Sequence, residues 1–432
     1  MRQGRGGYDL RIDPVSHRLK GKVKVPGDKS IAHRAAIFAS LAHGRSLVRN
    51  AAPGGDFDST LRCLAAIGTR IERKGDAVSL EGGGLAEPQD VLDAGNSGTT
   101  ARLLCGVLAG AGTYAVITGD ASLRRRPMSR VINPLREMGA NITGRCEGRF
   151  APVTICPASL RGAEHVLSVA SAQVKSSLLL AGLMADGPTT VTEPWKSRDH
   201  TERLLPAFGA HLEVNGTTVR IYPGTLHPAD VDVPGDFSSA AFLIAAACTI
   251  PGSELMVEDV GLNPTRTGLL DVLRRMGAEV EVESRGGIEP AGTIWVTNLG
   301  MHGTDIMPGE IPSVLDEIPV LSCVAAVAEG TTRILGASEL RVKETDRLEA
   351  IRANLSALGA RVEVEGDSLI ITGVGQLEGG RVRSFGDHRI AMAMAVAALN
   401  AKAPVEIDDV SCVDISYPGF FQDLASLVGV SI

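Results

Sequence analysis

The chain has 432 residues, of which 44% are hydrophobic and 3% aromatic, and its formal net charge at pH 7 is −7. An acidic protein with few aromatic rings lacks the cationic surface and the stacking side chains that nucleic acid requires, so no nucleic-acid partner is expected. The longest apolar run, 240–248, is far shorter than the roughly 18 to 20 residues that span a bilayer, and residues 1–13 lack the apolar core of a secretory signal. We therefore expect a cytoplasmic protein without a membrane partner.

The seven cysteines show no CxxC spacing, and the nine histidines show no HExxH or HxH spacing. Neither a disulfide framework nor a zinc site is indicated, so no metal and no cofactor are expected. Most of the cysteines lie in apolar stretches, and we interpret them as small core residues.

A short phrase, an apolar residue followed by glycine at the end of a helical apolar pattern, recurs six times along the chain. The six glycines are Gly68, Gly139, Gly209, Gly277, Gly359 and Gly429. Their successive spacings of 71, 70, 68, 82 and 70 residues define six repeats of about 70 residues. Helical spacing before each glycine and alternation after it predict that every repeat closes with a helix, a left-handed glycine and a strand, the last strand being 430–432.

Within a repeat the pattern reads strand, helix, strand, helix, strand, which predicts an α/β fold with parallel strand pairs. The repeats are expected to form two lobes of three, the first from 22–234 and the second from 235–432 together with 1–21, which would add a strand. The helices expected over 240–248 and 390–399 are apolar on nearly every face, so we expect them inside a domain with sheets packed around them.

The segment 25–34 recurs 208 residues later in a modified form. Residues kept in both copies are expected to serve the fold, whereas residues found in one copy are candidates for function. Its proline, glycine, aspartate and serine persist, which predicts a strand-to-helix turn with a capped helix N-terminus. Lys29 and Arg34, in contrast, become Phe237 and Phe242. The scaffold does not need these two cations, so we interpret them as binding a phosphate or carboxylate at the helix N-terminus. A nucleotide P-loop is excluded because aspartate, not glycine, precedes the lysine.

Further turns carry polar side chains where a helix is expected to begin. In chain order they are 96–99, 124–126, 171–173 and 198–200, and the third aligns with 387–389 in the sixth repeat. Each also has a purely structural interpretation as a helix cap, a solvated arginine patch or a surface salt-bridge cluster.

Two acidic segments lie near the cations of the second half. Asp316 is flanked by apolar residues, which are expected to raise its pKa toward a range useful for proton transfer. Lys343 and Arg347 form a like-charge pair four residues apart, which an ordinary helix start does not favour, so we expect an anion between them. Local cations in an acidic protein suit small anionic substrates.

Six segments, in this order, resemble the motifs of the EPSP synthase (3-phosphoshikimate 1-carboxyvinyltransferase) family. They are Pro26–Ser30 with Arg34, Gly95–Thr99, Arg126–Pro127, Ser171–Gln173, Arg341–Leu348 and Asp387–Arg389. The resemblance implies a two-domain inside-out α/β barrel of the enolpyruvyl transferase type, with three repeats in each domain. We also expect a monomer. It also implies transfer of the enolpyruvyl group of phosphoenolpyruvate to the 5-hydroxyl of shikimate 3-phosphate, with release of phosphate, in aromatic amino-acid synthesis.

The resemblance further implies a set of site residues. Shikimate 3-phosphate would contact Lys29, Ser30, Arg34, Ser171, Ala172, Gln173, Arg198, Asp316 and Lys343. Phosphoenolpyruvate would contact Lys29, Asn96, Gly98, Arg126, Gln173, Arg347 and Arg389. Asp316 would remove the proton of the 5-hydroxyl, and Glu344 and Lys29 would exchange the second proton.

Four positions depart from the pattern of many family members and indicate the divergent bacterial class. They are Asp28, Ala32, Ala172 and Ile415, the last in place of a lysine that some members use on phosphoenolpyruvate. Gly98 leaves room for the inhibitor glyphosate, whereas the missing lysine would weaken its binding.

Two alternatives remain at this stage. UDP-N-acetylglucosamine enolpyruvyl transferase shares the fold and the donor, but it would carry Lys-Asn in place of Lys29-Ser30. A repeat-built interaction protein whose units merely stack is the second, although repeats of about 70 residues exceed the usual length in solenoids.

Overall fold

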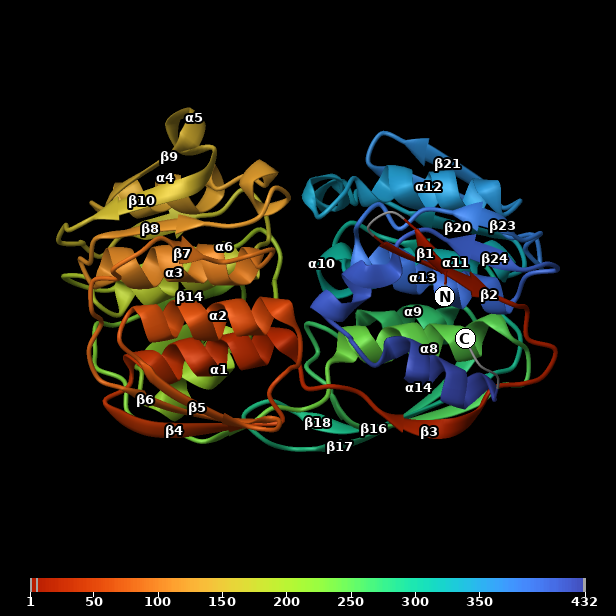
Figure 1. Cartoon of the computed structure of the whole chain (residues 1–432), viewed down its shortest axis with the longest axis horizontal. Coiled ribbons are helices and arrows are strands. Elements are labelled where there is room, and N and C mark those ends of the chain that lie inside the picture. Colours follow the sequence, from red (N-terminus) through yellow and green to blue (C-terminus); the bar gives the residue numbers. More distant parts are fainter. Residues whose placement is uncertain (1, 5–6, 430–432) are drawn as a thin grey trace. The chain divides into compact units, whose positions relative to one another are not determined.

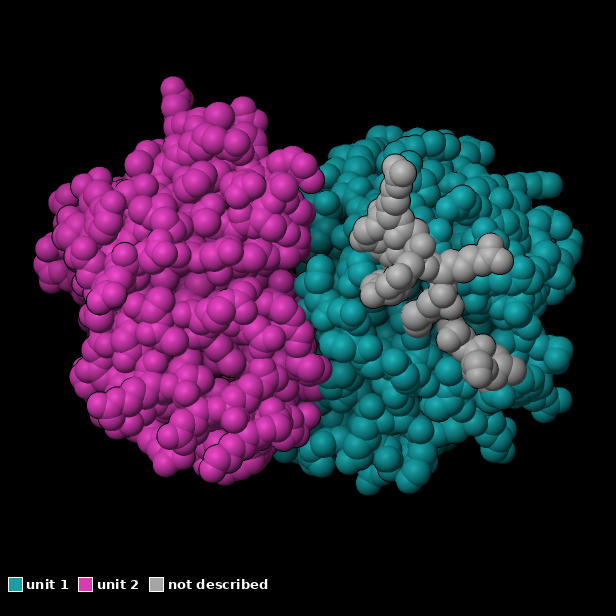
Figure 2. Space-filling model, in the orientation of Figure 1, with its two compact units in different colours: residues 1–26, 234–432 teal, residues 27–233 magenta. Residues whose placement is uncertain are grey.

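A computed structural model of the chain describes residues 2–4 and 7–429. It divides into two compact units, coloured separately in Figure 2: unit 1 comprises Met1–Pro26 and Pro234–Ile432, and unit 2 comprises Gly27–Val233. Within the described ranges, no helix combines the length and the apolar character needed to cross a membrane.

Unit 2 contains three four-stranded sheets, with strand orders β15-β4-β6-β5, β7-β8-β10-β9 and β11-β12-β14-β13. The strands are β4 (Gly44–Arg49), β5 (Arg70–Lys74), β6 (Ala77–Gly82), β7 (Leu92–Asp93), β8 (Ala115–Thr118), β9 (Asn141–Gly144), β10 (Phe150–Cys156), β11 (Glu164–Val166), β12 (Thr189–Thr192), β13 (Leu212–Asn215), β14 (Thr218–Ile221) and β15 (Val231–Asp232). The helices are α1 (Lys29–Leu41), α2 (Gly55–Ala66), α3 (Gly98–Gly110), η1 (Leu123–Arg125), α4 (Ser129–Glu137), α5 (Arg145–Gly148), α6 (Ala172–Gly182), α7 (His200–Leu204) and η2 (Leu205–Phe208).

Unit 1 repeats this plan with the orders β17-β18-β16-β3, β19-β20-β22-β21 and β1-β2-β24-β23. The strands are β1 (Arg2–Gly4), β2 (Gly7–Ile12), β3 (Lys20–Lys24), β16 (Glu254–Gly261), β17 (Ala278–Arg285), β18 (Ala291–Asn298), β19 (Asp305–Ile306), β20 (Thr331–Ile334), β21 (Arg361–Glu365), β22 (Ser368–Thr372), β23 (Gly380–Val382) and β24 (Val405–Ile407). The helices are α8 (Phe237–Thr249), α9 (Gly268–Arg275), α10 (Ile311–Val314), α11 (Ile318–Val327), η3 (Ser338–Val342), α12 (Arg347–Ala357), α13 (His388–Leu399), η4 (Val410–Ile415) and α14 (Phe420–Val428).

The repeated glycines have the predicted conformation. All six have φ between 64° and 104°, which is the left-handed region that glycine adopts without steric cost. Five of them are followed by a strand or a short extended segment that leads into one. The strand predicted for 430–432 lies outside the described residues.

The prediction of parallel pairs was wrong for most of each sheet. Every sheet has one parallel pair at an edge, such as β15 with β4, and two antiparallel pairs, such as β4 with β6 and β5 with β6. The strand predicted after each glycine is in fact the first strand of a hairpin. The β5–β6 turn contains Gly75 at φ 62°, and such a tight turn joins antiparallel strands directly.

The N-terminal strands determine where the units divide. β2 pairs with β24, as expected for residues that add a strand to the second half, and β3 runs parallel to β16. Residues 22–26 therefore belong to unit 1, as does Pro234, although the prediction placed both in the lobe 22–234. In unit 2 the edge position beside β4 is taken by β15, which follows the third repeat.

The most apolar helices form the interior of each unit. Every residue of α8 is buried, and so are Ile390–Leu399 of α13, as predicted from their apolar faces. In unit 2, Figure 1 shows α1, α2 and α3 side by side, with the sheet of β4, β5 and β6 on one side of them. Five of the seven cysteines are buried, and burial raises the pKa of Cys105 and Cys248 to about 12, whereas Cys146 is exposed.

Candidate functional site

The duplicated turns cap their helices as predicted. Asp28 accepts the N–H of Ile31 at the start of α1 (2.9 Å), and Asp236 accepts the N–H of Ser238 at the start of α8 (3.0 Å). Lys29 is the first residue of α1 and forms an ion pair with the carboxylate of Asp56 in α2. Its side chain is only 26% exposed, so it is not the solvated lysine that a polar turn suggests.

Arg34 is buried and joins three helices. Its Nε donates to Thr201 Oγ1 of α7 at 2.8 Å, and its Nη2 donates to Ser176 Oγ of α6 at 2.9 Å. Its Nη1 donates to the carbonyl of Ser30 at 3.0 Å. The duplicate's Phe242 packs against another ring instead. Arg34 therefore also has a structural role, which comparing the two copies does not reveal.

The N-terminus of α3 gathers two guanidinium groups. Ser97 caps the helix by accepting the N–H of Thr100 at 3.1 Å. Arg126 donates to Asn96 twice, from Nη2 to Oδ1 at 2.6 Å and from Nη1 to the carbonyl at 3.1 Å. A Cβ atom added at Gly98 would lie 2.5 Å from Nη1 of Arg102 and 3.4 Å from Nη1 of Arg126. Glycine at this position thus leaves room beside both cations.

The N-terminus of α6 is tied to that of α3. Ser171 caps α6, and Gln173 donates from Nε2 to Thr99 Oγ1 at 3.0 Å. Gln173 Oε1 accepts from Nη1 of Arg102 at 2.7 Å. Sequence reasoning missed Arg102, although its position one helical turn after Gly98 was a usable signal.

Unit 2 thus links the N-termini of α1, α3 and α6 by side-chain contacts. The carbonyl of Ala172, the first residue of α6, accepts from Arg34 of α1 at 3.5 Å, and Gln173 reaches Thr99 of α3. Arg198 lies half-buried just before α7. The positive end of the helix dipole at each N-terminus, together with the cations Lys29 and Arg126, favours anions.

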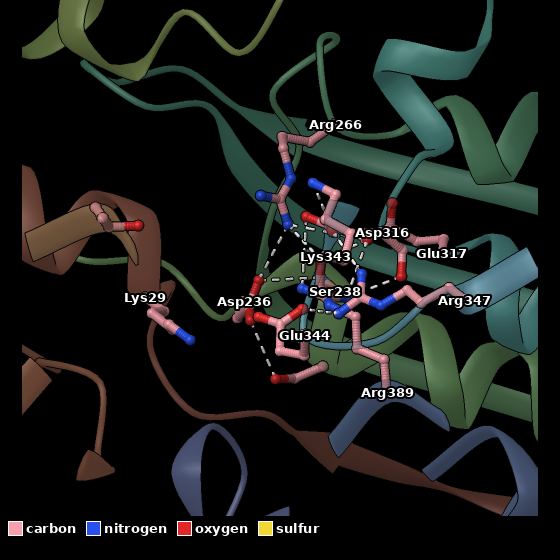
Figure 3. A network of polar contacts seen from close by, with 12 residues as sticks. Lys29, Asp236, Ser238, Arg266, Asp316, Glu317, Lys343, Glu344, Arg347 and Arg389 are labelled. Carbon is pink, nitrogen blue, oxygen red and sulfur yellow. Dashed lines mark hydrogen bonds and ion pairs between the residues drawn. The ribbon is translucent and has the colours of Figure 1, made fainter. Parts of the chain in front are cut away.

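In unit 1, Arg347 lies at the centre of a buried polar network (Figure 3). Its Nε is 2.8 Å from Asp387 Oδ2, its Nη2 is 2.7 Å from Glu344 Oε2, and its Nη1 is 3.3 Å from Asp316 Oδ1. Burial by itself lowers the pKa of Arg347, but the three carboxylates outweigh burial and raise it. An anion was expected between Lys343 and Arg347. In the structure, carboxylates of the protein itself occupy the positions around the Arg347 guanidinium.

The surroundings of Asp316 differ from those expected. Its sequence neighbours are apolar, but its side chain meets three cations, with Arg347 at 3.3 Å, Arg389 at 3.6 Å and Lys343 at 4.0 Å. The expectation of an apolar environment was therefore wrong, because residues distant in sequence supply the contacts. Arg389 also donates to the carbonyl of Asp316 at 2.9 Å.

A further cation in unit 1 was not predicted. Arg266 is buried, and its Nη2 lies 2.5 Å from Ser238 Oγ and 3.3 Å from Asp236 Oδ1. Ser238 also donates to Glu317, whose Oε1 is 3.9 Å from Nη1 of Arg389. The duplicated segment carries no signal for Arg266, which lies 28 residues beyond Ser238.

Taken together, these groups supply cations for anionic ligands and carboxylates for proton transfer. Asp316 and Glu344 both contact the same guanidinium, which fixes their positions, and Lys343 provides an ammonium group beside Asp316. Over the described part of the chain, no group of three or more His, Cys, Asp or Glu side chains is arranged to hold a metal ion.

Comparisons with known proteins agree over nearly the whole chain. The family model described as EPSP synthase (3-phosphoshikimate 1-carboxyvinyltransferase) matches residues 14–424. Relatives named 3-phosphoshikimate 1-carboxyvinyltransferase from Bacillus cereus (strain ATCC 10987 / NRS 248) and Bacillus thuringiensis (strain Al Hakam) are each 49% identical over 422 residues, covering 96% of this chain and 98% of the relative. A solved EPSP synthase from Acinetobacter baumannii has a TM-score of 0.87 and 40% identity, covering 98% of both chains.

Proposed function

The chain belongs to the EPSP synthase family, and from that premise we propose how its residues serve the two substrates. The reaction is the transfer of the enolpyruvyl group of phosphoenolpyruvate to the 5-hydroxyl of shikimate 3-phosphate, which gives 5-enolpyruvylshikimate 3-phosphate and phosphate in the shikimate pathway. UDP-N-acetylglucosamine as the acceptor is not favoured, because the relatives are named for the shikimate reaction.

The linked N-termini of α1, α3 and α6 are the single observation that best supports this function. They bring together three helix starts, an ammonium at Lys29 and a guanidinium at Arg126. Both substrates are multiply anionic, and binding them together requires cations that offset their mutual repulsion.

We assign the contacts as follows. Lys29, Ser30, Arg34, Ser171, Ala172, Gln173, Arg198, Asp316 and Lys343 hold shikimate 3-phosphate. Lys29, Asn96, Gly98, Arg126, Gln173, Arg347 and Arg389 hold phosphoenolpyruvate. For Arg347 this contact replaces one of its present carboxylate partners, whereas Arg389 is the more exposed of the two arginines.

The chemistry we propose is an addition followed by an elimination. Asp316 accepts the proton of the 5-hydroxyl as that oxygen attacks the central carbon of phosphoenolpyruvate, and the methylene carbon gains a proton. Loss of a proton from the same methyl group then expels phosphate and restores the double bond. Glu344 and Lys29 exchange the proton at that carbon. Both are ionisable, Lys29 belongs to both proposed contact sets, and Glu344 contacts Arg347 of the phosphoenolpyruvate set.

We propose further that the enzyme acts in the cytoplasm as a monomer, without a metal, a cofactor, or a nucleic-acid or membrane partner. Sedimentation equilibrium measures the mass of the assembly directly. Glyphosate is expected to compete with phosphoenolpyruvate beside Gly98. We expect weak glyphosate binding, because Ile415, which packs against the hydrophobic core, replaces the lysine that some family members use. Inhibition constants for the wild type and for Gly98→Ala test this, since an added methyl group would exclude the inhibitor.

The deciding experiment is phosphate release from phosphoenolpyruvate, with and without shikimate 3-phosphate. The expected result is release that depends on shikimate 3-phosphate and is absent with UDP-N-acetylglucosamine. Release with the latter acceptor, or none with the former, would refute the assignment.

A further inference from the structure

Lys175, Glu193 and Glu202 form a buried ion-pair cluster that contacts two turns of unit 2. Nζ of Lys175, in α6, is 2.6 Å from Glu193 Oε2 and 2.6 Å from Glu202 Oε1. The side chains of Lys175, Glu193 and Glu202 are 1%, 1% and 5% exposed. None of the three was singled out in the sequence, and none belongs to the proposed substrate contacts or proton-transfer groups.

Glu193 bonds both turns through their backbones. It follows β12, and its Oε1 accepts the N–H of Ser171 at 3.0 Å. Its Oε2 accepts the N–H of Ser197 at 3.3 Å, in addition to the bond from Lys175. Ser171 is the N-cap of α6, and Ser197 directly precedes Arg198. One carboxylate therefore sets the separation of the two turns that carry Ser171 and Arg198.

The charges of the cluster identify Glu193 as the group that fixes the turns. Two carboxylates share one ammonium in a buried place, and burial raises the pKa of Glu202 despite the opposing effect of Lys175. Glu202 Oε2 is buried and has no hydrogen-bond partner among the described residues, whereas Glu193 accepts from two backbone N–H groups and an ammonium. Hydrogen bonds to charged groups are about twice as strong as neutral ones, so Glu193 holds both turns firmly when it is ionised.

We propose that Glu193 and Lys175 are positioning residues for shikimate 3-phosphate, an inference that rests on the proposed function. A helix N-terminus with a serine cap and a nearby arginine together suit the phosphate group of that substrate. Both must reach one ligand at the same time, so their spacing matters. Misplacement of a binding group by about 1 Å can slow an enzyme reaction on the order of 100-fold. Ser171 and Arg198 are both assigned to shikimate 3-phosphate alone, so the loss is expected for that substrate.

The test compares Glu193→Gln and Lys175→Met with the wild type in steady-state kinetics. We expect the KM for shikimate 3-phosphate to rise about tenfold or more, while the KM for phosphoenolpyruvate changes by less than about twofold. The preference for shikimate 3-phosphate over shikimate, which lacks the phosphate, should fall by a similar factor. A purely structural role predicts a lower melting temperature and a smaller active fraction, with both KM values unchanged.

Two further variants keep the test decisive. The triple variant Lys175→Met/Glu193→Gln/Glu202→Gln leaves no unpaired buried charge and so folds where a single variant fails. Lys402→Met removes an exposed ion pair with Glu378 in unit 1 and is expected to match the wild type. A triple variant with the wild-type KM for shikimate 3-phosphate would overturn the proposal. Failure of the wild type to release phosphate would instead refute the proposed function, so the two failures are distinguishable.

Discussion

Replacing Arg347 with methionine should destabilise unit 1 strongly, because three carboxylates depend on this one side chain. The Asp387 side chain is 0% exposed and would keep its charge without its guanidinium partner, although the N–H of Arg389 still donates to it at 2.9 Å. Asp316 and Glu344 are 12% and 20% exposed, so water compensates them in part. Removing one partner of a buried pair costs about 3 to 5 kcal/mol, and most of that loss is expected from Asp387.

The two tryptophans permit a measurement on one unit alone. Trp295 lies in β18 of unit 1, and Trp195 lies in unit 2. In a Trp195→Phe background, the fluorescence of Trp295 during urea titration reports on unit 1. The free energy of unfolding from this transition, with and without Arg347→Met, gives the cost directly.

A matched control comes from the same helix. Arg352 and Glu349 form an exposed pair in α12, with side chains 42% and 53% exposed, and Arg352→Met should cost less than about 1 kcal/mol. Adding Asp387→Asn to Arg347→Met removes the stranded charge and should restore part of the stability. If Arg347→Met costs no more than Arg352→Met, or if the second substitution restores nothing, the reasoning from buried charge is wrong.

Three further predictions concern unit 2. Lys29→Ala should abolish turnover and also cost about 1 to 2 kcal/mol, because it strands the nearly buried Asp56; adding Asp56→Asn should restore the melting temperature but not the activity. Burial, followed by the neighbouring cations, lowers the pKa of His33 well below 6.5, so the unfolded chain takes up a proton that the folded chain does not. Stability should therefore fall as the pH drops below 6.5, by up to about 1.4 kcal/mol per pH unit, and His33→Gln should flatten that slope in urea titrations at pH 5 to 7. Gly98→Ala should fold normally, because the flexible Arg102 side chain can shift away from the new methyl group, but should raise the KM for phosphoenolpyruvate; an unchanged KM would contradict a role for this glycine in the site.

The helix ends were predictable because they depend on local geometry. Each repeat ends its helix at a residue in the left-handed conformation, after which the chain reverses direction. Glycine adopts this conformation without steric cost, as at Gly68 and its five counterparts. The hairpins were missed because a short tight turn, such as the one at Gly75, leaves the alternating pattern almost unbroken. The pairing of β15 with β4 joins Val231 to Val48, and no local pattern specifies a contact over that separation.

The candidate turns were predictable for the same reason, but their partners were not. Asp28 and Ser97 each accept the N–H of a residue three positions later, so these caps can be recognised in the sequence itself. Asp56 at Lys29 and Arg102 at Gln173 come from other helices, so only the packed structure identifies them. The environment of Asp316 shows the limit most clearly, because its spatial neighbours are cations although its sequence neighbours are apolar.

The two copies of the capped turn show how one scaffold acquired two kinds of site. Both keep the aspartate cap, which typically contributes about 1 kcal/mol and is needed wherever the helix starts. In unit 2 the residue after the cap is Lys29, which Asp56 balances. In unit 1 that residue is the buried Phe237. The cation at this turn is instead Arg266, which donates to Ser238 and forms an ion pair with Asp236. Loss of a cation from a repeated segment therefore does not imply a neutral site, because the next element can supply the charge.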